Sequence, residues 1–131
     1  MLESCIEDNG LMEIENDGYD SNSAIADLVN GLRSASGNDS WQFINAGGPL
    51  GTDEIAVGLI YRSDVVAPSA ELLVLDSGNS ALDEQGQVLF DDSRNRPMLA
   101  QRFRLLDNDA EFAVMVNHLK SKGSGCGAAD G

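Results

Sequence analysis

The chain has 131 residues, of which 42% are hydrophobic and 23% charged, so it is long enough for one domain with its own core. Its 22 acidic and 8 basic residues give a formal net charge of -14, which counts against tight binding of a polyanion unless basic groups or bound cations compensate locally. No apolar run approaches the roughly 20 residues of a membrane span, and residues 1–10 lack the features of a signal peptide. We therefore expect either a cytosolic protein or one whose true beginning lies outside this sequence.

The first part of the chain predicts a strand followed by an amphipathic helix. Residues 10–15 (GLMEIE) have the pattern of a short strand, and residues 16–20 (NDGYD) that of a turn. Asn22 or Ser23 can cap a helix in which apolar residues recur at three- and four-residue spacing, and Gly37 can end it. The apolar stripe of this helix consists of Ile25, Leu28, Val29 and Leu32.

From Trp41 onward the apolar pattern changes to that of strands. The candidate strands are residues 41–44, 55–61, 72–75, 98–106 and 112–116. Residues 55–61 are almost continuously apolar, which is typical of a central strand covered on both faces. We expect residues 76–96 to form a long polar surface loop and residues 107–109 a hairpin turn.

The predicted order of strand, helix and then four or five strands favours an α/β fold. The sheet would be mixed or largely antiparallel, with the one clear helix on one face. A single helix leaves much of the second face of a central strand uncovered. Another chain, or a segment outside this sequence, should then cover that face.

Two predicted strand ends carry side chains suited to phosphate chemistry. Glu13 ends the first strand, where a carboxylate can bind a hard cation, although most glutamates in such places are only solvated. His118 is the only histidine and ends the last strand; without a ligand it would be an ordinary surface or core residue. The loop after it can donate hydrogen bonds or positive charge to a phosphate through Lys120, Ser121, Lys122 and Ser124.

Arg94 and Arg96 form a second small basic spot in this acidic chain. Their ordinary role would be to pair with neighbouring acids such as Asp91 and Asp92. Most of the other acids are expected to form a solvated surface. The alternative is that a few of them hold divalent cations, which would also screen a phosphate substrate.

Four segments together are more specific than any single residue. They are residues 11–19 (LMEIENDGY), 51–62 (GTDEIAVGLIYR), 95–103 (NRPMLAQRF) and 116–124 (VNHLKSKGS). In this order and at these spacings they resemble the deoxyribonuclease-like endonuclease/exonuclease/phosphatase superfamily, in particular its secreted bacterial extracellular nuclease branch. The resemblance spans about residues 9–126.

The resemblance implies part of a four-layered α/β sandwich whose active site lies along the strand ends. Glu13 would bind the catalytic Mg²⁺, with Mn²⁺ or Ca²⁺ as alternatives, and His118 would hydrogen-bond the scissile phosphate. An acid, Asp53 or Glu54, would orient that histidine. The remaining contacts to phosphate or to the nucleic-acid backbone would come from Arg96, Asn117, Lys120 and Ser121. In such a site the cation polarises a phosphoryl oxygen while His118 and Lys120 stabilise transition-state charge.

The sequence also departs from the family pattern. It lacks the family's first strand with its metal-side asparagine, the Asp-x-Asn motif after the histidine strand, and the C-terminal Asp-His pair that supplies the general base. We therefore expect residues 1–131 to be a partial domain with little or no turnover, and Mg²⁺ to bind on the order of millimolar. The resemblance also implies that Cys126 pairs with a cysteine outside this sequence, which would leave it free here; pairing with Cys5 stays open.

The predicted function is that of part of a secreted, divalent-cation-dependent hydrolase, an endonuclease that cleaves DNA or RNA phosphodiester bonds. One alternative is a phosphatase of the same superfamily that acts on a small phosphate ester. The other is a catalytically inactive, truncated module. Nucleic acid is the expected partner as substrate, no membrane is expected, and nothing in the sequence argues strongly for an oligomer.

Overall fold

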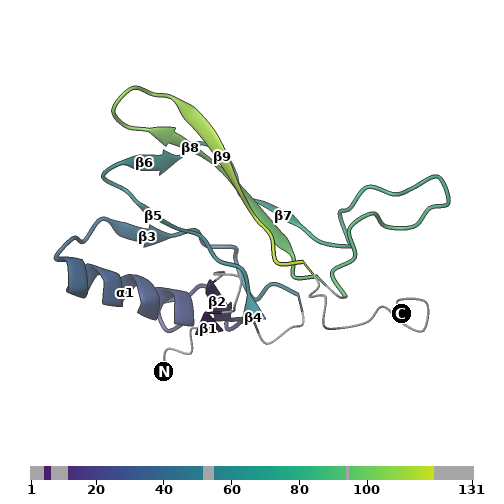
Figure 1. Ribbon diagram of the computed structural model, residues 1–131, viewed down its shortest axis with the longest axis horizontal. Helices are drawn as coiled ribbons and strands as arrows, with labels where there is room; N and C mark the ends of the chain where they lie inside the picture. The colour runs from purple at the N-terminus through teal and green to yellow at the C-terminus, as the bar shows by residue number, and fades with distance from the viewer. Residues whose placement is uncertain (1–4, 7–11, 52–54, 94, 120–131) are drawn as a thin grey trace.

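The computed structural model describes residues 5–6, 12–51, 55–93 and 95–119, with only the backbone path given for residues 5–6 and 12–14. The fold is α/β, with one helix and antiparallel strand pairs among these residues (Figure 1). The elements are β1 (Cys5–Ile6), β2 (Met12–Glu15), α1 (Ala24–Ser36), β3 (Trp41–Phe43), β4 (Ile55–Ala56), β5 (Ile60–Arg62), β6 (Val66–Pro68), β7 (Leu73–Leu75), β8 (Met98–Leu105) and β9 (Glu111–Val116).

Helix α1 lies where the apolar stripe predicts it. Ile25 and Val29 are buried, and Gly37 ends the helix in the left-handed conformation at φ 65°. Ser23 occupies the N-cap position, but its hydroxyl donates to the Asp20 carbonyl oxygen at 2.7 Å. The backbone N–H of Ala24 is instead bound by both carboxylate oxygens of Asp17 at 3.1 Å. The cap therefore comes from the turn that follows β2, which ties the helix to that strand.

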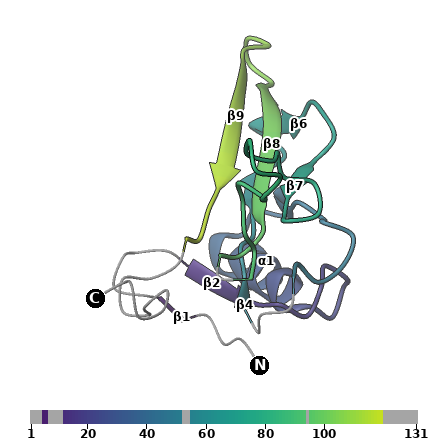
Figure 2. The same ribbon diagram turned by 90° about the vertical axis from the view of Figure 1, so that its right-hand side faces the viewer.

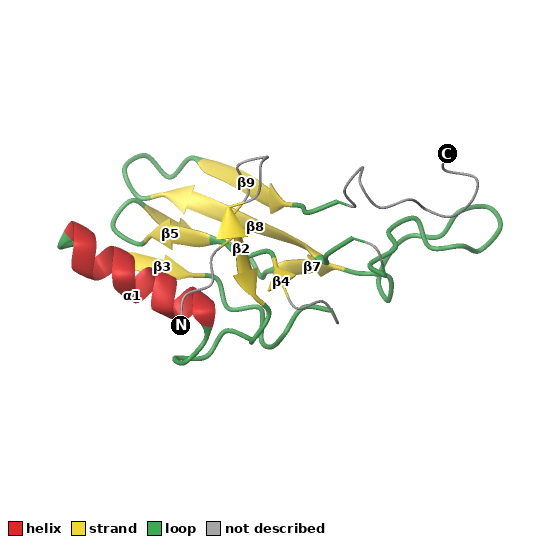
Figure 3. Ribbon diagram, turned by 60° about the horizontal axis from the view of Figure 1, so that its bottom comes forward, coloured by secondary structure: helices red, strands yellow, loops and turns green. Residues whose placement is uncertain are grey.

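The strands form three groups. In the first, β2 lies between β1 and β4; in the second, β3 pairs with β5. In the third and largest, β8 pairs with β9 along one side and with β7 and β6 in succession along the other. In Figures 1 and 3, α1, β3, β5 and the β8–β9 hairpin follow one another in that order across the molecule.

The prediction of one continuous central strand over residues 55–61 is wrong. The segment leaves the β2–β4 pair after Ala56 and enters the β3–β5 pair at Ile60, so it serves two sheets in turn. Between them its carbonyl groups have other partners: Val57 O accepts from the Tyr19 hydroxyl at 3.1 Å and Leu59 O from Ile44 N at 2.9 Å. The apolar run is explained by burial in two clusters, because Ala56 and Val57 belong to one and Leu59 to the other.

The described part of the predicted loop over residues 76–96 extends away from the sheets (Figure 1). It contains an isolated bridge between Leu82 and Val88, closed by a turn in which Gly86 has φ 79°. The short strand β6 is an addition to the predicted set. Its Pro68 removes a backbone donor, which is a feature of edge strands and weakens the strand pattern in the sequence.

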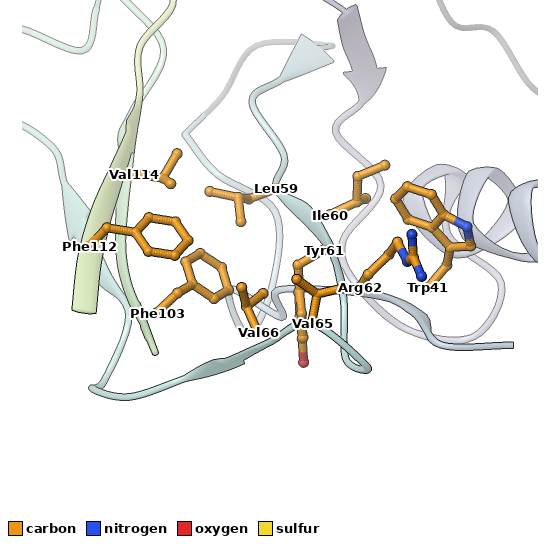
Figure 4. A pocket seen from close by; sticks show the side chains of 10 residues that line it. All are labelled: Trp41, Leu59, Ile60, Tyr61, Arg62, Val65, Val66, Phe103, Phe112 and Val114. Atoms are coloured by element: carbon orange, nitrogen blue, oxygen red, sulfur yellow. The ribbon is translucent and has the colours of Figure 1, made fainter. Parts of the chain in front are cut away.

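Two buried clusters hold these elements together. The first joins α1 to β4 and β8 through Ile25, Ala56 and Leu99, with Val116 of β9 packed against it. The second consists of Ile44, Leu59 and Phe103 and lies between the β3–β5 and β8–β9 layers. The second cluster leaves an open hollow of about 420 Å³ (Figure 4). The hollow is lined by Trp41, Leu59, Ile60, Tyr61, Arg62, Val65, Val66, Phe103, Phe112 and Val114.

Candidate functional site

The sequence predicts that His118 ends the last strand; in the structure β9 ends at Val116, and His118 lies two residues beyond it. The β8–β9 register, with Leu99 opposite Val116, carries the chain past the segment that precedes β8. There Arg96 N donates to His118 O at 3.1 Å, so the backbone of the predicted arginine and that of the predicted histidine are in direct contact. His118 is 7% exposed, whereas Asn117 beside it is exposed. The histidine is therefore a buried polar residue at the margin of the sheet.

Glu13 lies in β2 opposite Cys5, and β2 continues through Glu15, which pairs with Ile55 of β4. Glu13 is thus the second residue of a four-residue strand and not its last. The backbone positions this residue two places before the strand end, beside the end of β4, because Ile14 pairs with Ala56, the last residue of β4. Asp53, Glu54, Lys120 and Ser121 are predicted site residues that lie outside the described residues, as do Arg94, Lys122, Ser124 and Cys126.

A series of contacts connects the end of β2 with the end of β9. Asn16 follows β2 directly, and its side-chain amide donates to Leu50 O while its amide oxygen accepts from Leu50 N, both at 2.7 Å. The next residue, Gly51, lies against Pro97, so closely that a Cβ at Gly51 would come within 3.2 Å of the proline ring. Pro97 follows Arg96, which contacts His118.

This connection depends on features that short-range patterns do not contain. The turn residue Asn16 is recognisable from the sequence, but its partner is 34 residues away. Gly51 combines a φ of +66° with close approach to a proline ring, so two independent constraints favour glycine there. None of Asn16, Leu50, Gly51 or Pro97 is among the predicted contact residues, yet these four hold the two strand ends in place.

The same two strand ends rest on one core. Ala56, opposite Ile14 of β2, shares the first buried cluster with Leu99, and Val116 packs against that cluster two residues before His118. Figure 2 shows the chain that leaves β9 descending toward the end of the molecule that holds β2 and β4. The backbones that carry Glu13 and His118 therefore belong to one packed unit.

A polar hollow of about 230 Å³ lies beside the turn after β2, lined by Asp17, Gly18, Tyr19, Asp20, Asn45, Gly47, Gly48 and Pro49. Its carboxylates have structural partners. Asp17 binds the helix N-terminus, and Asp20 accepts from Asn22 N at 2.8 Å. Asn45 likewise accepts from Gly47 N at 2.7 Å. These acids fix the loop, and within the described residues no group of three or more His, Cys, Asp or Glu is placed to hold a metal ion.

The acids next to the predicted arginines also have local partners. Asp92 accepts from the Ser77 hydroxyl at 2.6 Å, and Asp91 accepts from Ser93 N at 2.9 Å. Ion pairs join Arg62 to Asp64 at 2.6 Å and Arg104 to Asp109 at 2.6 Å. In the first pair, the hydrogen bonds from Arg62 and Ser40 hold the pKa of the Asp64 carboxyl at about 2.

In the described part of the chain, no helix is long and apolar enough to cross a membrane. No family model matches the chain, and no curated protein or solved structure matches it. The arrangement of the residues is therefore the basis on which a function can be argued.

Proposed function

We propose that this chain is part of a divalent-cation-dependent phosphodiesterase, a nuclease that hydrolyses DNA or RNA, and that its strands belong to a four-layered α/β sandwich. The observation that supports the proposal best is the series of contacts from Asn16 through Leu50, Gly51 and Pro97 to Arg96 and His118. It connects the strand of the proposed metal ligand with the strand of the proposed phosphate ligand.

In this proposal Glu13 binds Mg²⁺, and the ion polarises an oxygen of the phosphate group. His118 donates a hydrogen bond to the phosphate, and Arg96, Asn117, Lys120 and Ser121 provide further contacts. Asp53 or Glu54 orients the histidine. Burial supports the role of His118, because a side chain that is only 7% exposed has little freedom to change its orientation before the ligand arrives.

The charge of the molecule supports a role for the cation as well. A net charge of -14 repels a polyanion at long range, and a bound divalent ion offsets that repulsion where the phosphate must approach. The same charge creates a difficulty for any binding experiment, because many acids attract cations weakly. A test of the metal site therefore needs a control that changes the charge equally.

Two substitutions in β2 provide this control. Glu13→Gln and Glu15→Gln each remove one negative charge from the same strand, two residues apart. Paramagnetic Mn²⁺ broadens the amide signals of residues near its site, so NMR spectra of the 131-residue chain can locate the ion. We expect broadening of the amides of β2 and of Asn117–Leu119, with affinity on the order of millimolar.

Glu13→Gln should abolish this broadening at both strand ends, whereas Glu15→Gln should leave it in place. Equal loss in both variants would mean that the ion follows the general negative potential, and the metal assignment would then be wrong. If only the amides of β2 broaden and those of Asn117–Leu119 do not, then Glu13 and His118 do not share a site and that part of the proposal is wrong.

The catalytic part of the proposal concerns the complete domain. Joined to the coding sequence on both sides of it, the chain should cleave plasmid DNA when Mg²⁺ is present, and Glu13→Gln should abolish cleavage without changing the fold. Hydrolysis of a sugar phosphate instead of DNA would identify the small-ester phosphatase. If the restored domain cleaves neither substrate, the catalytic proposal is wrong.

A further inference from the structure

Strand β9 has one side of its backbone without a strand partner in the described part of the chain. In an antiparallel ladder, successive residues direct their N–H and C=O groups to opposite sides. Leu105 N donates to Ala110 O at 2.8 Å, which sets the order of alternation. The even-numbered residues of β9 therefore bond to β8, and the odd-numbered ones, Glu111, Ala113 and Met115, direct their backbone groups outward.

This outer side lacks the features that usually protect a sheet edge. Edge strands are commonly very short or carry proline, lysine or a bulge, because free backbone groups otherwise recruit another strand. On the opposite side of β8, β6 has three residues and contains Pro68, and β7 also has three. β9 has six residues, pairs with β8 along all of them, and contains no proline or lysine.

After Glu111, the side chains of β9 are apolar and partly exposed. Met115 is 66% exposed and Phe112 is 41% exposed, although Phe112 stacks on Phe103 with ring centroids 5.7 Å apart. No charged residue occurs from Phe112 to Leu119, in a chain that is 23% charged. An edge with these properties favours an apolar, uncharged strand as its partner.

We propose that β9 pairs antiparallel with β9 of a second copy of this chain, about a twofold axis at Val114. This register places Ala113 opposite Met115 of the second copy, and these are residues whose backbone groups point outward. On the other face, Val114 meets Val114 and Phe112 meets Val116, so the apolar wall of the 420 Å³ hollow continues into the second copy.

The charges at the two ends of β9 favour the antiparallel orientation for this pair of strands. The hairpin end of β9 is acidic, with Asp107, Asp109 and Glu111. Antiparallel pairing brings this end to the uncharged residues Asn117–Leu119 of the second copy and keeps the two acidic ends apart. The whole molecules, each with a net charge of -14, still repel each other, so added salt should strengthen the pair.

Sedimentation velocity of the 131-residue chain, over about a hundredfold range of concentration, tests this pairing by mass action. We expect a monomer–dimer equilibrium whose dimer fraction rises with protein concentration and with NaCl. Met115→Lys should weaken the dimer by about tenfold or more, because lysine on an edge strand opposes the addition of another strand.

Leu73→Lys is the matched control. Leu73 of β7 lies opposite Ala100, which lies opposite Met115, so the two positions are in one row on one face of the sheet. Both are well exposed, Leu73 at 56%. Edge pairing predicts that Leu73→Lys leaves the dimer unchanged. If both variants weaken the dimer equally, the copies associate through the sheet face and the proposal is wrong. The proposal is also wrong if neither variant weakens the dimer, or if the chain stays monomeric at every concentration.

Hydrogen exchange provides a readout of the backbone itself. In the dimer the amides of Ala113 and Met115 should exchange slowly, and on dilution to the monomer they should exchange fast. The amides of Val114 and Val116, which bond to β8, should be protected in both states. Ala113→Pro removes an outward donor without touching the β8 ladder and should prevent dimerisation in a folded chain. Unchanged exchange at residues 113 and 115 in the dimer would overturn the pairing.

Discussion

Tyr19 connects the turn after β2 with the segment that leaves β4. Its side chain is 5% exposed, and its hydroxyl donates to Val57 O, which belongs to another buried residue. Tyr19→Phe leaves that carbonyl oxygen in the core without its donor, so we expect a loss of about 1–3 kcal/mol in the free energy of unfolding. Urea denaturation at neutral pH measures it. Tyr61→Phe, at a half-buried ring, is the control and should cost less.

The burial of Tyr19 also predicts how the stability of the protein depends on pH. Burial raises the pKa of Tyr19 to about 12, because the charged phenolate is poorly solvated there. The neutral form is therefore favoured in the folded state. The neutral Tyr19 side chain contributes its full stabilisation below the ordinary tyrosine pKa near 10. This contribution is lost as the pH rises through about 12, which lowers the free energy of unfolding by about 3 kcal/mol.

The difference in stability between the wild type and Tyr19→Phe should consequently narrow as the pH rises through this window. Urea denaturation of both proteins at several pH values between about 9 and 12 gives this difference directly. A difference that stays constant would contradict the assigned burial of the hydroxyl.

At the scale of elements, two glycines of α1 should respond to the same substitution in opposite ways. Gly31 lies inside the helix, and a Cβ there meets nothing within 4 Å, so Gly31→Ala should stabilise the protein by about 0.5–1 kcal/mol. Gly37 ends the helix with φ +65°, so Gly37→Ala should destabilise it by about 1 kcal/mol. Thermal unfolding of both variants measures the two signs. The same sign for both would show that the helix does not end at Gly37.

The difference between local features and long-range contacts explains which elements can be predicted from the sequence. Helix α1 is predictable because its stripe, and the glycine that ends it, are local features. Residues 55–61 are not, since a continuous apolar run says that the segment is buried but not that it divides between two sheets. That division follows from contacts with Tyr19 and Ile44, which are distant in the sequence.

At the scale of the whole molecule, the sequence places Arg96 and His118 near strand ends, but it does not show that the two segments meet. The motifs place His118 at the end of a strand and Arg96 before another, and the antiparallel register of β8 and β9 then brings them together. The hydrogen bonds between Asn16 and Leu50 cannot be predicted from local sequence, because Asn16 alone indicates only a turn and Leu50 alone only a core residue. Glu13 and His118 in a shared metal and phosphate site remain a prediction.

The net charge of -14 also acts on the molecule as a whole. Self-repulsion is larger in the compact state than in the extended chain, and ions screen it. We therefore expect the free energy of unfolding to rise by on the order of 1 kcal/mol when NaCl is added to a low-salt solution. Urea denaturation is the suitable measurement, because urea carries no charge of its own.

MgCl₂ at the same ionic strength separates general screening from binding. A site that holds Mg²⁺ in the folded state adds a stabilisation that grows with the logarithm of the ion concentration above its dissociation constant. The wild type should therefore gain more from MgCl₂ than from NaCl, and Glu13→Gln should lose this excess while keeping the NaCl response. If stability falls as NaCl is added, repulsion between the acids is not what opposes folding. If Glu13→Gln retains the whole magnesium excess, the ion binds at other acids and not at β2.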